Sequence, residues 1–543
     1  MTLSSRVRWR YVLGAGLLLL IAGGGFYLGT EPRTRSLALS SFRLALGTSA
    51  LSLPLGASLA IFLVRTDLPG RRLACLVLAG MLLVPLFVQA TAWDAGFGRL
   101  GWYTVGASLN RPPLHSWLGA VWIHGVAASP WVTLIVGTSL RLIDPELEDQ
   151  ALLDATPLSV LLKITLPRTA NAIALAACWI VVTTSGDMTV TDLLGVRTYA
   201  EEIYTGFALG SSLGEASLGL GPVAALLACL LGLVLLVTFW VPSPGNWVVL
   251  RPARVFLLGR WRWVVGLPAW GVLCVVAGIP LANLCYKAGA IGPGSSADAA
   301  RDWSVVQFLQ VVIETPVKFS SDFVWTVAIS GSATLICFLV ALPLAWFGRR
   351  GGWRSVPALL VAAVTMVIPG PLIGLWSIWC VEWINLQPLF WLYDKTILLP
   401  VLCLAVRCVP ICLLLTWIHV QAVAQVLIDQ AVLEGASRWR IFWHLLVWPS
   451  RAGFGVAALV TFAMGMGDLA TTILVLPPGV TTVAFRVFDL VHYGVRYELA
   501  GLGLTSGLLF FFVGVVVWQL GLWRRVHGSL DATGSIGEQR ETT

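Results

Sequence analysis

Two acidic residues in apolar surroundings are the first side chains in this sequence that could do chemistry. Asp187 and Asp468 each follow a glycine at the end of a long uncharged stretch, and 281 positions separate them. Acids buried in a membrane are costly, so they usually mark a translocation pathway or a proton relay. We expect both carboxylates near the outer membrane boundary and close to one axis. There they either line a pathway or cap helix ends.

Arg407 is a third charged side chain of this kind, because it lies near the middle of the apolar stretch 397–417. A guanidinium at such a depth needs an acid or backbone carbonyls as partners. We expect Arg407 to be a structural anchor or a further contact in the same pathway.

Other catalytic and binding motifs are absent from the sequence. It has no G-x-x-x-x-G-K-[ST] segment to hold ATP phosphates, and its six His form no cluster with acids or a nucleophile. Its ten Cys include no C-x-x-C pair and lie mostly in apolar stretches, which favours packing over metal binding. We therefore expect no catalytic residues, no metal site and no cofactor bound by this chain.

The composition is typical of a membrane protein. The 543 residues are 57% hydrophobic and 11% charged, whereas soluble domains carry about 25% charge. A membrane-spanning helix needs about 20 apolar residues. The uncharged runs predict twelve such segments, at about 11–29, 42–64, 73–93, 117–140, 170–190, 218–240, 263–283, 323–346, 355–379, 397–417, 452–475 and 502–523.

The basic residues predict the orientation of these segments. With the N-terminus in the cytoplasm, 22 of the 35 Lys and Arg fall in cytoplasmic regions and 12 fall outside. This bias agrees with the positive-inside rule and places both termini in the cytoplasm. The net charge is +8, but the 22 cytoplasmic basic residues are spread over seven regions. They therefore do not indicate a nucleic-acid surface.

The sequence repeats itself. The matching stretches are 148–155 with 429–436 and 186–188 with 467–469 at an interval of 281, and Arg65 and Pro85 with Arg349 and Pro369 at an interval of 284. Each half holds six predicted segments, so the two halves would have parallel orientations. We expect a first half at 1–250 and a second half at 251–543.

Each half has one charged stretch between its fourth and fifth segments, on the predicted cytoplasmic side. The first stretch is 144–168 and the second is 428–450. Asp144, Pro145 and Glu146 form a good helix start, and Gly435 would permit a tight turn. Each stretch therefore predicts a short surface helix, a turn, and a second helix that returns to the membrane.

These two stretches resemble the EAA loop of ABC importer permeases. In the first, the resemblance rests on Glu148, Ala151, Asp154, Ala155, Leu166 and Pro167, with Asp154 in place of the glycine. In the second, it rests on Asp429, Ala431, Gly435, Ala436, Ser437 and Trp439, with Asp429 in place of the glutamate and Pro449 one residue late. The resemblance implies that both loops dock on an ATPase subunit and couple its movement to transport.

Residues 429–504 resemble Fe(III)-type permeases with two fused halves, through G-D-L-A-T-T, P-P-G and H-Y-G. The resemblance implies an all-α polytopic fold of about twelve helices in two parallel repeats, in a bacterial inner membrane. The implied partners are the lipid bilayer, an ABC ATPase homodimer that binds ATP and Mg, and a periplasmic or extracellular substrate-binding protein.

The cargo implied by this resemblance is Fe(III), with thiamine, phosphonate, sulfate or polyamine as alternatives. Two other classes of protein are weaker interpretations. A twelve-helix secondary transporter would need coupling-ion groups at the membrane midplane, where these segments carry little charge. A structural scaffold gives no reason for two similar cytoplasmic loops.

Overall fold

The structure is a computed structural model that describes residues 32–208, 255–290, 303–493 and 497–538. Within these ranges the chain is helical, and its β-pairing is limited to two isolated bridges. The longer helices are α2 (Pro32–Arg65), α3 (Arg71–Leu83), α4 (Leu86–Phe97), α6 (Ser116–Arg141), α10 (Ala170–Ser185), α12 (Tyr199–Ala208), α15 (Arg262–Leu273), α16 (Ile279–Gly289), α17 (Val305–Lys318), α18 (Ser320–Gly348), α19 (Val356–Val367), α20 (Gly370–Ile384), α22 (Leu398–Gln421), α25 (Trp448–Met466), α26 (Val483–Tyr493) and α27 (Tyr497–Glu538).

The protein is an all-α polytopic membrane protein. Among the described residues, seven helices are long and apolar enough to cross a membrane, and three bent helix pairs bring the number of possible spans to ten. These ten correspond to ten of the twelve segments predicted from the sequence. The predicted segments 11–29 and 218–240 lie outside the described residues, so the total of twelve stays a prediction.

Two of the predicted segments are each divided into two helices that meet at a sharp bend. The segment at 73–93 is broken between α3 and α4 with a bend of 105°, and the segment at 355–379 is broken between α19 and α20 with a bend of 102°. Pro85 and Pro369 stand at the two breaks, and the residue before each has extended backbone. Proline lacks an N–H and disfavours helical backbone in the preceding residue, which explains both bends.

Two further predicted segments, 170–190 and 452–475, extend beyond the helices that the structure contains. Helix α10 ends at Ser185 and α25 ends at Met466. Each helix is followed by a glycine and an aspartate, and the aspartate side chain organises a turn there. The uncharged stretch and the helix therefore end at different residues.

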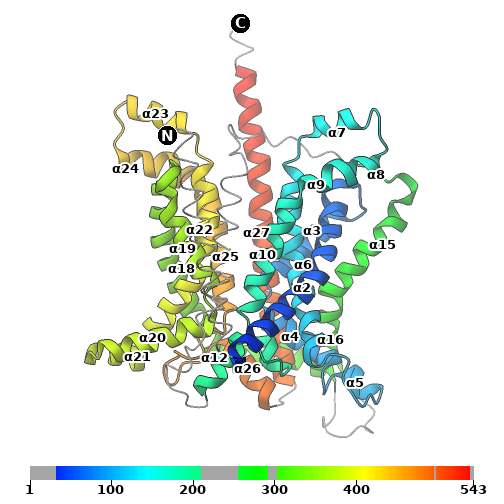
Figure 1. Ribbon diagram of the computed structural model, residues 1–543, viewed down its shortest axis with the longest axis vertical. Helices are drawn as coiled ribbons and strands as arrows, with labels where there is room; N and C mark the ends of the chain where they lie inside the picture. The colour runs from blue at the N-terminus through cyan, green and yellow to red at the C-terminus, as the bar shows by residue number, and fades with distance from the viewer. Residues whose placement is uncertain (1–31, 209–254, 291–302, 494–496, 539–543) are drawn as a thin grey trace.

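Two groups of helices pack in the same way (Figure 1). In each group a long helix, α2 or α18, lies along the helix before a charged stretch, α6 or α22, and the helix after it, α10 or α25. Small and branched apolar side chains fill both interiors, for example Ala60 and Val136 in the first group and Ala341 and Cys412 in the second. Within a membrane, close van der Waals packing of such side chains holds neighbouring helices together.

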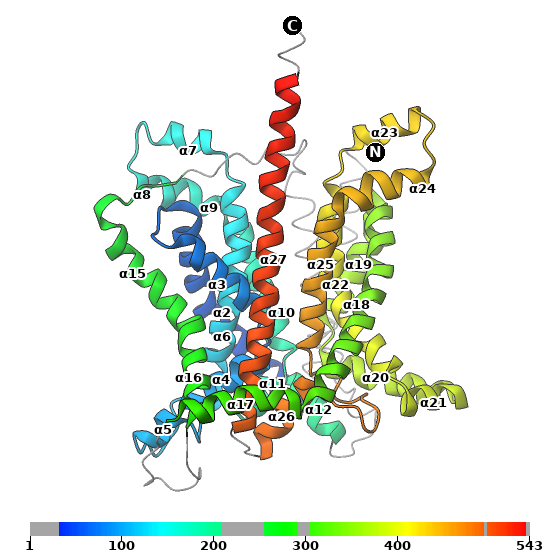
Figure 2. The ribbon, with the colours of Figure 1, turned by 180° about the vertical axis from the view of Figure 1, so that it is seen from behind.

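Several helices pack across from one predicted half to the other. Helices α15 and α16 lie in the second half of the sequence but pack against α2, α3 and α4. Leu68 and Leu78 share one buried cluster with Leu273, and Trp270 donates a hydrogen bond to the Pro69 carbonyl at 3.3 Å. Helix α27 also packs along α3 (Figure 2). The two halves are therefore interlocked.

Both charged stretches form helical hairpins at the same end of the molecule. The first contains α7 (Pro145–Ala151), α8 (Pro157–Val160), a π-helical segment (Leu161–Thr165) and α9 (Leu166–Arg168). The second contains α23 (Gln425–Leu433), α24 (Arg438–Ile441) and a π-helical segment (Phe442–Val447). Figures 1 and 2 show both hairpins near the C-terminal end of α27, with α17, α21 (Gln387–Lys395) and α26 at the opposite end.

Candidate functional site

The first hairpin begins as the sequence predicts. Asp144 precedes α7, and its carboxylate accepts a hydrogen bond of 3.0 Å from the Glu146 backbone N–H. Pro145 occupies the first helical position, where its missing N–H leaves no bond unmade. These residues fix where the surface helix starts and which of its faces points to the protein.

Glu148 is completely buried beneath this hairpin. It accepts hydrogen bonds of 2.6 Å from Arg65 Nη1 and 2.6 Å from Thr165 Oγ1, and the Arg65 side chain is also fully buried. Arg65 further donates to the Leu140 carbonyl at 2.5 Å. The pair joins α7, the end of α2 and the π-helical segment. Glu148 therefore sets the position of the hairpin and leaves other residues to form its exposed surface.

The second hairpin is anchored differently. Its first helix starts 280 positions after α7, so Ile428 falls at the buried position that Glu148 has in the first hairpin. Asp429, which the sequence alignment matched to Glu148, is exposed and accepts a hydrogen bond of 2.8 Å from Gln425. Arg349, the counterpart of Arg65, instead donates to the Val423 carbonyl.

The turns at the two hairpin tips also differ. Gly435 has a φ of +78°, and the amides of Gly435 and Ala436 bond the carbonyls of Val432 and Ala431 at 3.0 and 2.9 Å. This is a Schellman motif, in which glycine takes the left-handed position. Asp154, which stands in place of this glycine in the first stretch, does not have a positive φ. The shorter helix α7 ends in tighter turns instead.

Two exposed leucines at the hairpin tips were missed by sequence reasoning. Leu153 is 83% exposed and Leu433 is 87% exposed, and they stand 280 positions apart. The sequence feature that could have identified them is a leucine directly before an acidic residue, Asp154 or Glu434. The matched residues Ala151, Ala155, Ala431 and Ala436 are only partly buried, so each tip presents an apolar residue among small ones.

The late proline of the second hairpin has a structural explanation. The π-helical segment has six residues in the second hairpin and five in the first, so Pro449 follows one residue later than Pro167. Beyond this point the first hairpin bends by 57° into α10 at Thr169, whereas α24 to α25 form one straight span. Trp439 is 68% exposed and stacks on Phe442, with ring centroids 5.7 Å apart.

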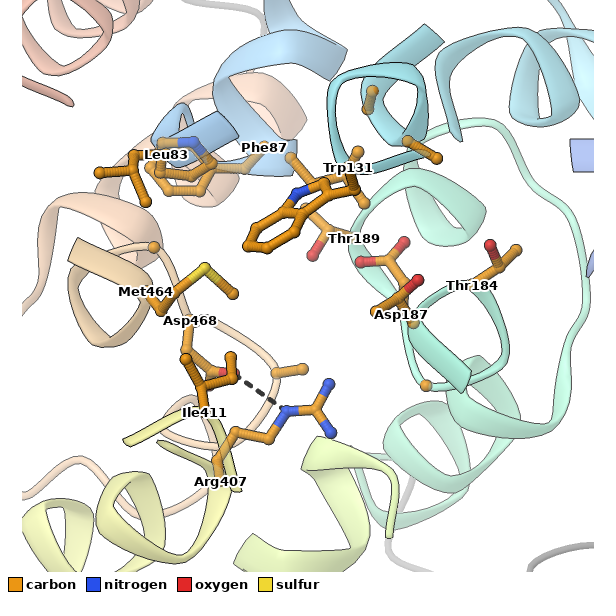
Figure 3. A pocket seen from close by; sticks show the side chains of 18 of the residues that line it. Leu83, Phe87, Trp131, Thr184, Asp187, Thr189, Arg407, Ile411, Met464 and Asp468 are labelled. Atoms are coloured by element: carbon orange, nitrogen blue, oxygen red, sulfur yellow. Dashed lines mark ion pairs between the residues drawn. The ribbon is translucent and has the colours of Figure 1, made fainter. Parts of the chain in front are cut away.

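The three charged residues that the sequence placed in apolar stretches line one pocket (Figure 3). Asp187, Asp468 and Arg407 contribute to its walls, and the pocket has a volume of about 230 Å³. Its lining comes from α3, α4, α6 and α10 on one side and from α19, α22 and α25 on the other. The structure thus brings these three residues together between the two groups of helices. Their role in a pathway stays a prediction.

Asp187 and Asp468 organise identical turns. Asp187 accepts a hydrogen bond of 3.0 Å from the Val190 N–H, and Asp468 accepts one of 2.9 Å from the Thr471 N–H. Thr191 and Thr472 then bond back to the aspartate carbonyls, each at 3.3 Å. Each acid therefore caps a turn, as one of the two alternatives predicted, and also faces the pocket.

The basic partners of the two acids differ. Arg407 Nε lies 3.7 Å from an Asp468 carboxylate oxygen, and Arg407 also donates to the Ile368 carbonyl at 3.3 Å. Asp187 is instead 3.4 Å from Nε2 of His124, a buried residue of α6. The sequence analysis missed His124. A histidine in the middle of an apolar stretch was the signal that could have identified it.

Close reciprocal contacts surround the pocket. Gly467 packs against Pro85, so that a Cβ on Gly467 would lie 2.7 Å from Pro85 Cγ. Gly186 faces Pro369 more loosely, since a Cβ there would lie 3.9 Å from Pro369 Cα. Each contact joins the glycine before an aspartate to the proline of a bent helix in the other half. Reciprocal contacts of this kind are those of a two-fold interface.

An ion pair outside the spans joins the two predicted halves. His492 Nε2 of α26 lies 3.1 Å from Asp192 Oδ2 of α11 (Thr189–Leu193). Burial raises the pKa of the Asp192 carboxyl, and the neighbouring His492 partly opposes that shift. The position 281 residues after Asp192 is Ile473, so this pair has no counterpart.

Comparison with known proteins adds no relative. No protein-family model matches the sequence, and a search of curated proteins gave no match. Within the described ranges, no group of three or more His, Cys, Asp or Glu is arranged to hold a metal ion.

Proposed function

We propose that this chain is the permease of a binding-protein-dependent ABC importer. The observation that carries the proposal is the presence of two helical hairpins at one end of the molecule, each continuous with a helix that ends at the interfacial pocket. The hairpins are the two stretches that resemble EAA loops. In this proposal 1–250 and 251–543 are fused permease halves with two parallel repeats.

The geometry offers a route from hairpin to pocket. The first hairpin leads through α10 to Gly186 and Asp187, and the second leads through α25 to Gly467 and Asp468. An α-helix rises 1.5 Å per residue, so the 19 residues of α25 carry a displacement over about 28 Å. Movement of the hairpins would therefore change the contacts that close around the pocket.

In this mechanism the chain supplies no catalysis. A partner ATPase dimer binds ATP and Mg, closes, and draws the two hairpins together. Contacts such as Gly467 with Pro85 then loosen, and the pocket opens toward a loaded binding protein on the other side. ATP shifts this equilibrium only through its different affinity for the two states, and the hairpins are where that difference enters.

Fe(III) is the cargo that the sequence resemblance implies, with thiamine, phosphonate, sulfate and polyamine as the alternatives. The described part of the chain holds no cluster of three metal-ligating side chains. An iron cargo would therefore pass this permease with ligands of its own. The proposed location is the bacterial inner membrane, with both hairpins and both termini in the cytoplasm.

The central test is reconstitution of the full chain in proteoliposomes with an importer ATPase and a binding protein from the same genome. Leu153→Asp and Leu433→Asp place a charge on the exposed hairpin tips, and we expect them to abolish ATPase binding and stimulated ATP hydrolysis. Leu386→Asp is the matched control, because Leu386 is 55% exposed at the opposite end. Equal ATPase binding by the tip and control variants would refute the proposal.

Orientation has its own test. Single cysteines at positions 152 and 433, in a background without the ten native Cys, should resist a membrane-impermeant thiol reagent in intact cells and react after permeabilisation. Ready labelling in intact cells would contradict a cytoplasmic location of the hairpins.

A proton-coupled secondary transporter is a second candidate, because His124 and Asp187 place a titratable pair in the pocket. Such pairs are typical of proton relays in pumps and transporters. Uptake by whole cells separates the two candidates. Uptake that stops with a protonophore while ATP remains high favours the secondary transporter, and uptake that follows ATP favours the importer.

A further inference from the structure

The chemistry of the interfacial pocket indicates what it binds. Two acidic and two basic side chains line it, namely Asp187, Asp468, His124 and Arg407. Arg407 is already engaged with Asp468 and the Ile368 carbonyl. Among the described residues, Asp187 pairs with no guanidinium, so its carboxylate keeps the capacity to bind a cation.

The hydrogen bonding of Asp187 is incomplete. Its carboxylate accepts a hydrogen bond from the Val190 N–H, although a carboxylate offers about four acceptor sites. His124 Nε2 is 3.4 Å away but makes no hydrogen bond with any described residue, and His124 is only 4% exposed. A buried polar atom without a partner is costly, so this wall of the pocket is built for an occupant that supplies polar contacts.

Aromatic rings stand beside this carboxylate. Trp131 and Trp179 both line the pocket, with ring centroids 5.0 Å apart and planes inclined by 38°. Figure 3 shows Trp131 and Phe87 facing the same opening as Asp187, with Arg407 and Asp468 across from them. Aromatic faces attract ammonium groups, and tryptophan does so most strongly.

We propose that the pocket binds a small organic cation, whose ammonium group pairs with Asp187 and lies against Trp131. The inference rests on the proposed importer function where it names the cargo class. The volume of about 230 Å³ is below the roughly 300–1,000 Å³ of pockets for drug-sized ligands, so the occupant is small. An anion would meet two carboxylates, and a bare metal ion would lack a third protein ligand.

This cargo class separates the alternatives listed for the importer. Thiamine and polyamines carry cationic nitrogen, whereas sulfate and phosphonate are anions and ferric ion is a hard metal cation. The pocket therefore favours the nitrogen-cation group over the iron that the sequence resemblance implies.

The test is equilibrium binding of radiolabelled choline to the purified full-length chain in detergent. The control ligand is the neutral isostere of choline, in which a tert-butyl group replaces the trimethylammonium group. We expect saturable choline binding that the isostere does not displace. Absence of saturable binding, or equal displacement by the isostere, would overturn the proposal.

Variants locate the site. Asp187→Asn keeps an oxygen that can cap the Val190 N–H but removes the charge, and we expect choline affinity to fall about tenfold or more. Trp131→Leu should weaken binding about fivefold. Arg407→Gln removes a positive charge from the pocket and should strengthen binding several-fold. Asp192→Asn, five residues from Asp187 and not in the lining, is the matched control and should bind normally.

The outcome for each variant is informative even if one of them fails to fold. Trp131→Leu and Asp187→Asn are independent, and unchanged affinity in whichever variant folds would refute the site. Failure of this proposal is also distinct from failure of the importer proposal. Choline binding without ATPase coupling keeps the cation site and rejects the importer, whereas coupling without choline binding keeps the importer and rejects this cargo class.

Discussion

The first hairpin is held from beneath by a buried ion pair, whereas the second is held by an isoleucine and a glycine turn. Glu148 and Arg65 are both fully buried in the first, and Ile428 occupies the corresponding place in the second. A buried ion pair contributes little net stability but penalises every arrangement that separates its charges. An apolar anchor tolerates small displacements. The comparison suggests a first hairpin of fixed position and a second that adjusts more freely.

The pocket repeats this contrast. The two aspartates make the same turn, but Asp468 faces a permanently charged guanidinium and Asp187 faces an imidazole that can be neutral. The same backbone therefore supports two electrostatic environments. The two turns share their backbone hydrogen bonds and differ in the side chains that face their aspartates.

Removal of Glu148 should have the largest effect on the free energy of unfolding and tests whether the two hairpins are anchored differently. Glu148→Ala leaves Arg65 buried without its acid, and we expect a loss of about 3–5 kcal/mol, seen as a lower thermal unfolding temperature in detergent. Asp429→Ala, the matched change in the second hairpin, should cost less than about 0.5 kcal/mol because Asp429 is exposed.

A double variant sharpens the same point. Replacing Glu148 with Leu and Arg65 with Met together should restore most of the stability, since an apolar pair of similar volume often replaces a buried ion pair without loss. Equal unfolding temperatures for Glu148→Ala and Asp429→Ala would show that the two hairpins are anchored alike.

The next largest effect concerns the two glycines beside the pocket. Gly467→Ala would place a methyl group 2.7 Å from Pro85 Cγ, and overpacking of this kind costs about 1–3 kcal/mol. Gly186→Ala has room, because the nearest atom would be the Val182 carbonyl oxygen at 3.4 Å. Thermal unfolding of the two variants measures the difference. A Gly186→Ala that is as damaging as Gly467→Ala would show that both contacts are equally tight.

Substitution of Gly435 should reduce stability less than Gly467→Ala does, but it should reduce the coupling of ATP hydrolysis to transport more. Valine is strained at a φ of +78°, by about 1–2 kcal/mol, and a Cβ there meets no atom within 4 Å, so the effect comes from the backbone alone. Gly435→Val should reduce stimulated ATP hydrolysis without unfolding the protein. Gly435→Asn should retain activity, because asparagine tolerates the left-handed conformation.

The matching change in the first hairpin is Asp154→Gly. Since Asp154 has no positive φ, glycine brings no relief of strain there, and we expect near-normal activity with a small entropic loss. Loss of ATPase binding in Asp154→Gly would instead assign Asp154 a direct contact with the partner.

The smallest effect is expected at the His492–Asp192 ion pair between the halves, which has no counterpart elsewhere in the described residues. A carboxyl whose pKa is raised by burial favours the folded state at low pH, and this contribution is lost as the pH rises through the raised pKa. Asparagine does not ionise, so the stability of Asp192→Asn does not fall with pH in this way. Its unfolding temperature relative to the unchanged protein should therefore rise by about 1 °C as the pH increases from the ordinary carboxyl pKa of 3.8 to neutral pH. A difference that is constant with pH would contradict this account of Asp192.

Much of the fold could be predicted because uncharged runs determine where helices cross the membrane. The bends could not be predicted from proline alone. Pro85 and Pro369 break their helices, yet Pro54, Pro130 and Pro410 lie inside continuous ones. Packing against other helices decides which prolines bend the chain, and a sequence without its contacts does not contain that information.

The charged residues of the candidate site could be predicted from the sequence, and its other residues could not. Asp187, Asp468 and Arg407 stood out because they are charged in apolar stretches, and all three line the pocket. The alignment of Asp429 with Glu148 was one residue away from the structural equivalence, because α23 is longer than α7. Neutral or aromatic residues such as His124 and Trp131 carry no charge signal. Only the fold shows which of many similar residues face the pocket.

The interlocked helices have a consequence for biosynthesis. Helix α3 packs along α27, and more than 400 residues separate them. Ribosomes add roughly 5–20 residues per second, so α3 waits about 20–80 s in the membrane before its neighbour is made. During that time its surface must be covered by lipid or by the insertion machinery. Because both helices belong to one chain, α27 arrives next to the surface of α3 that it will cover.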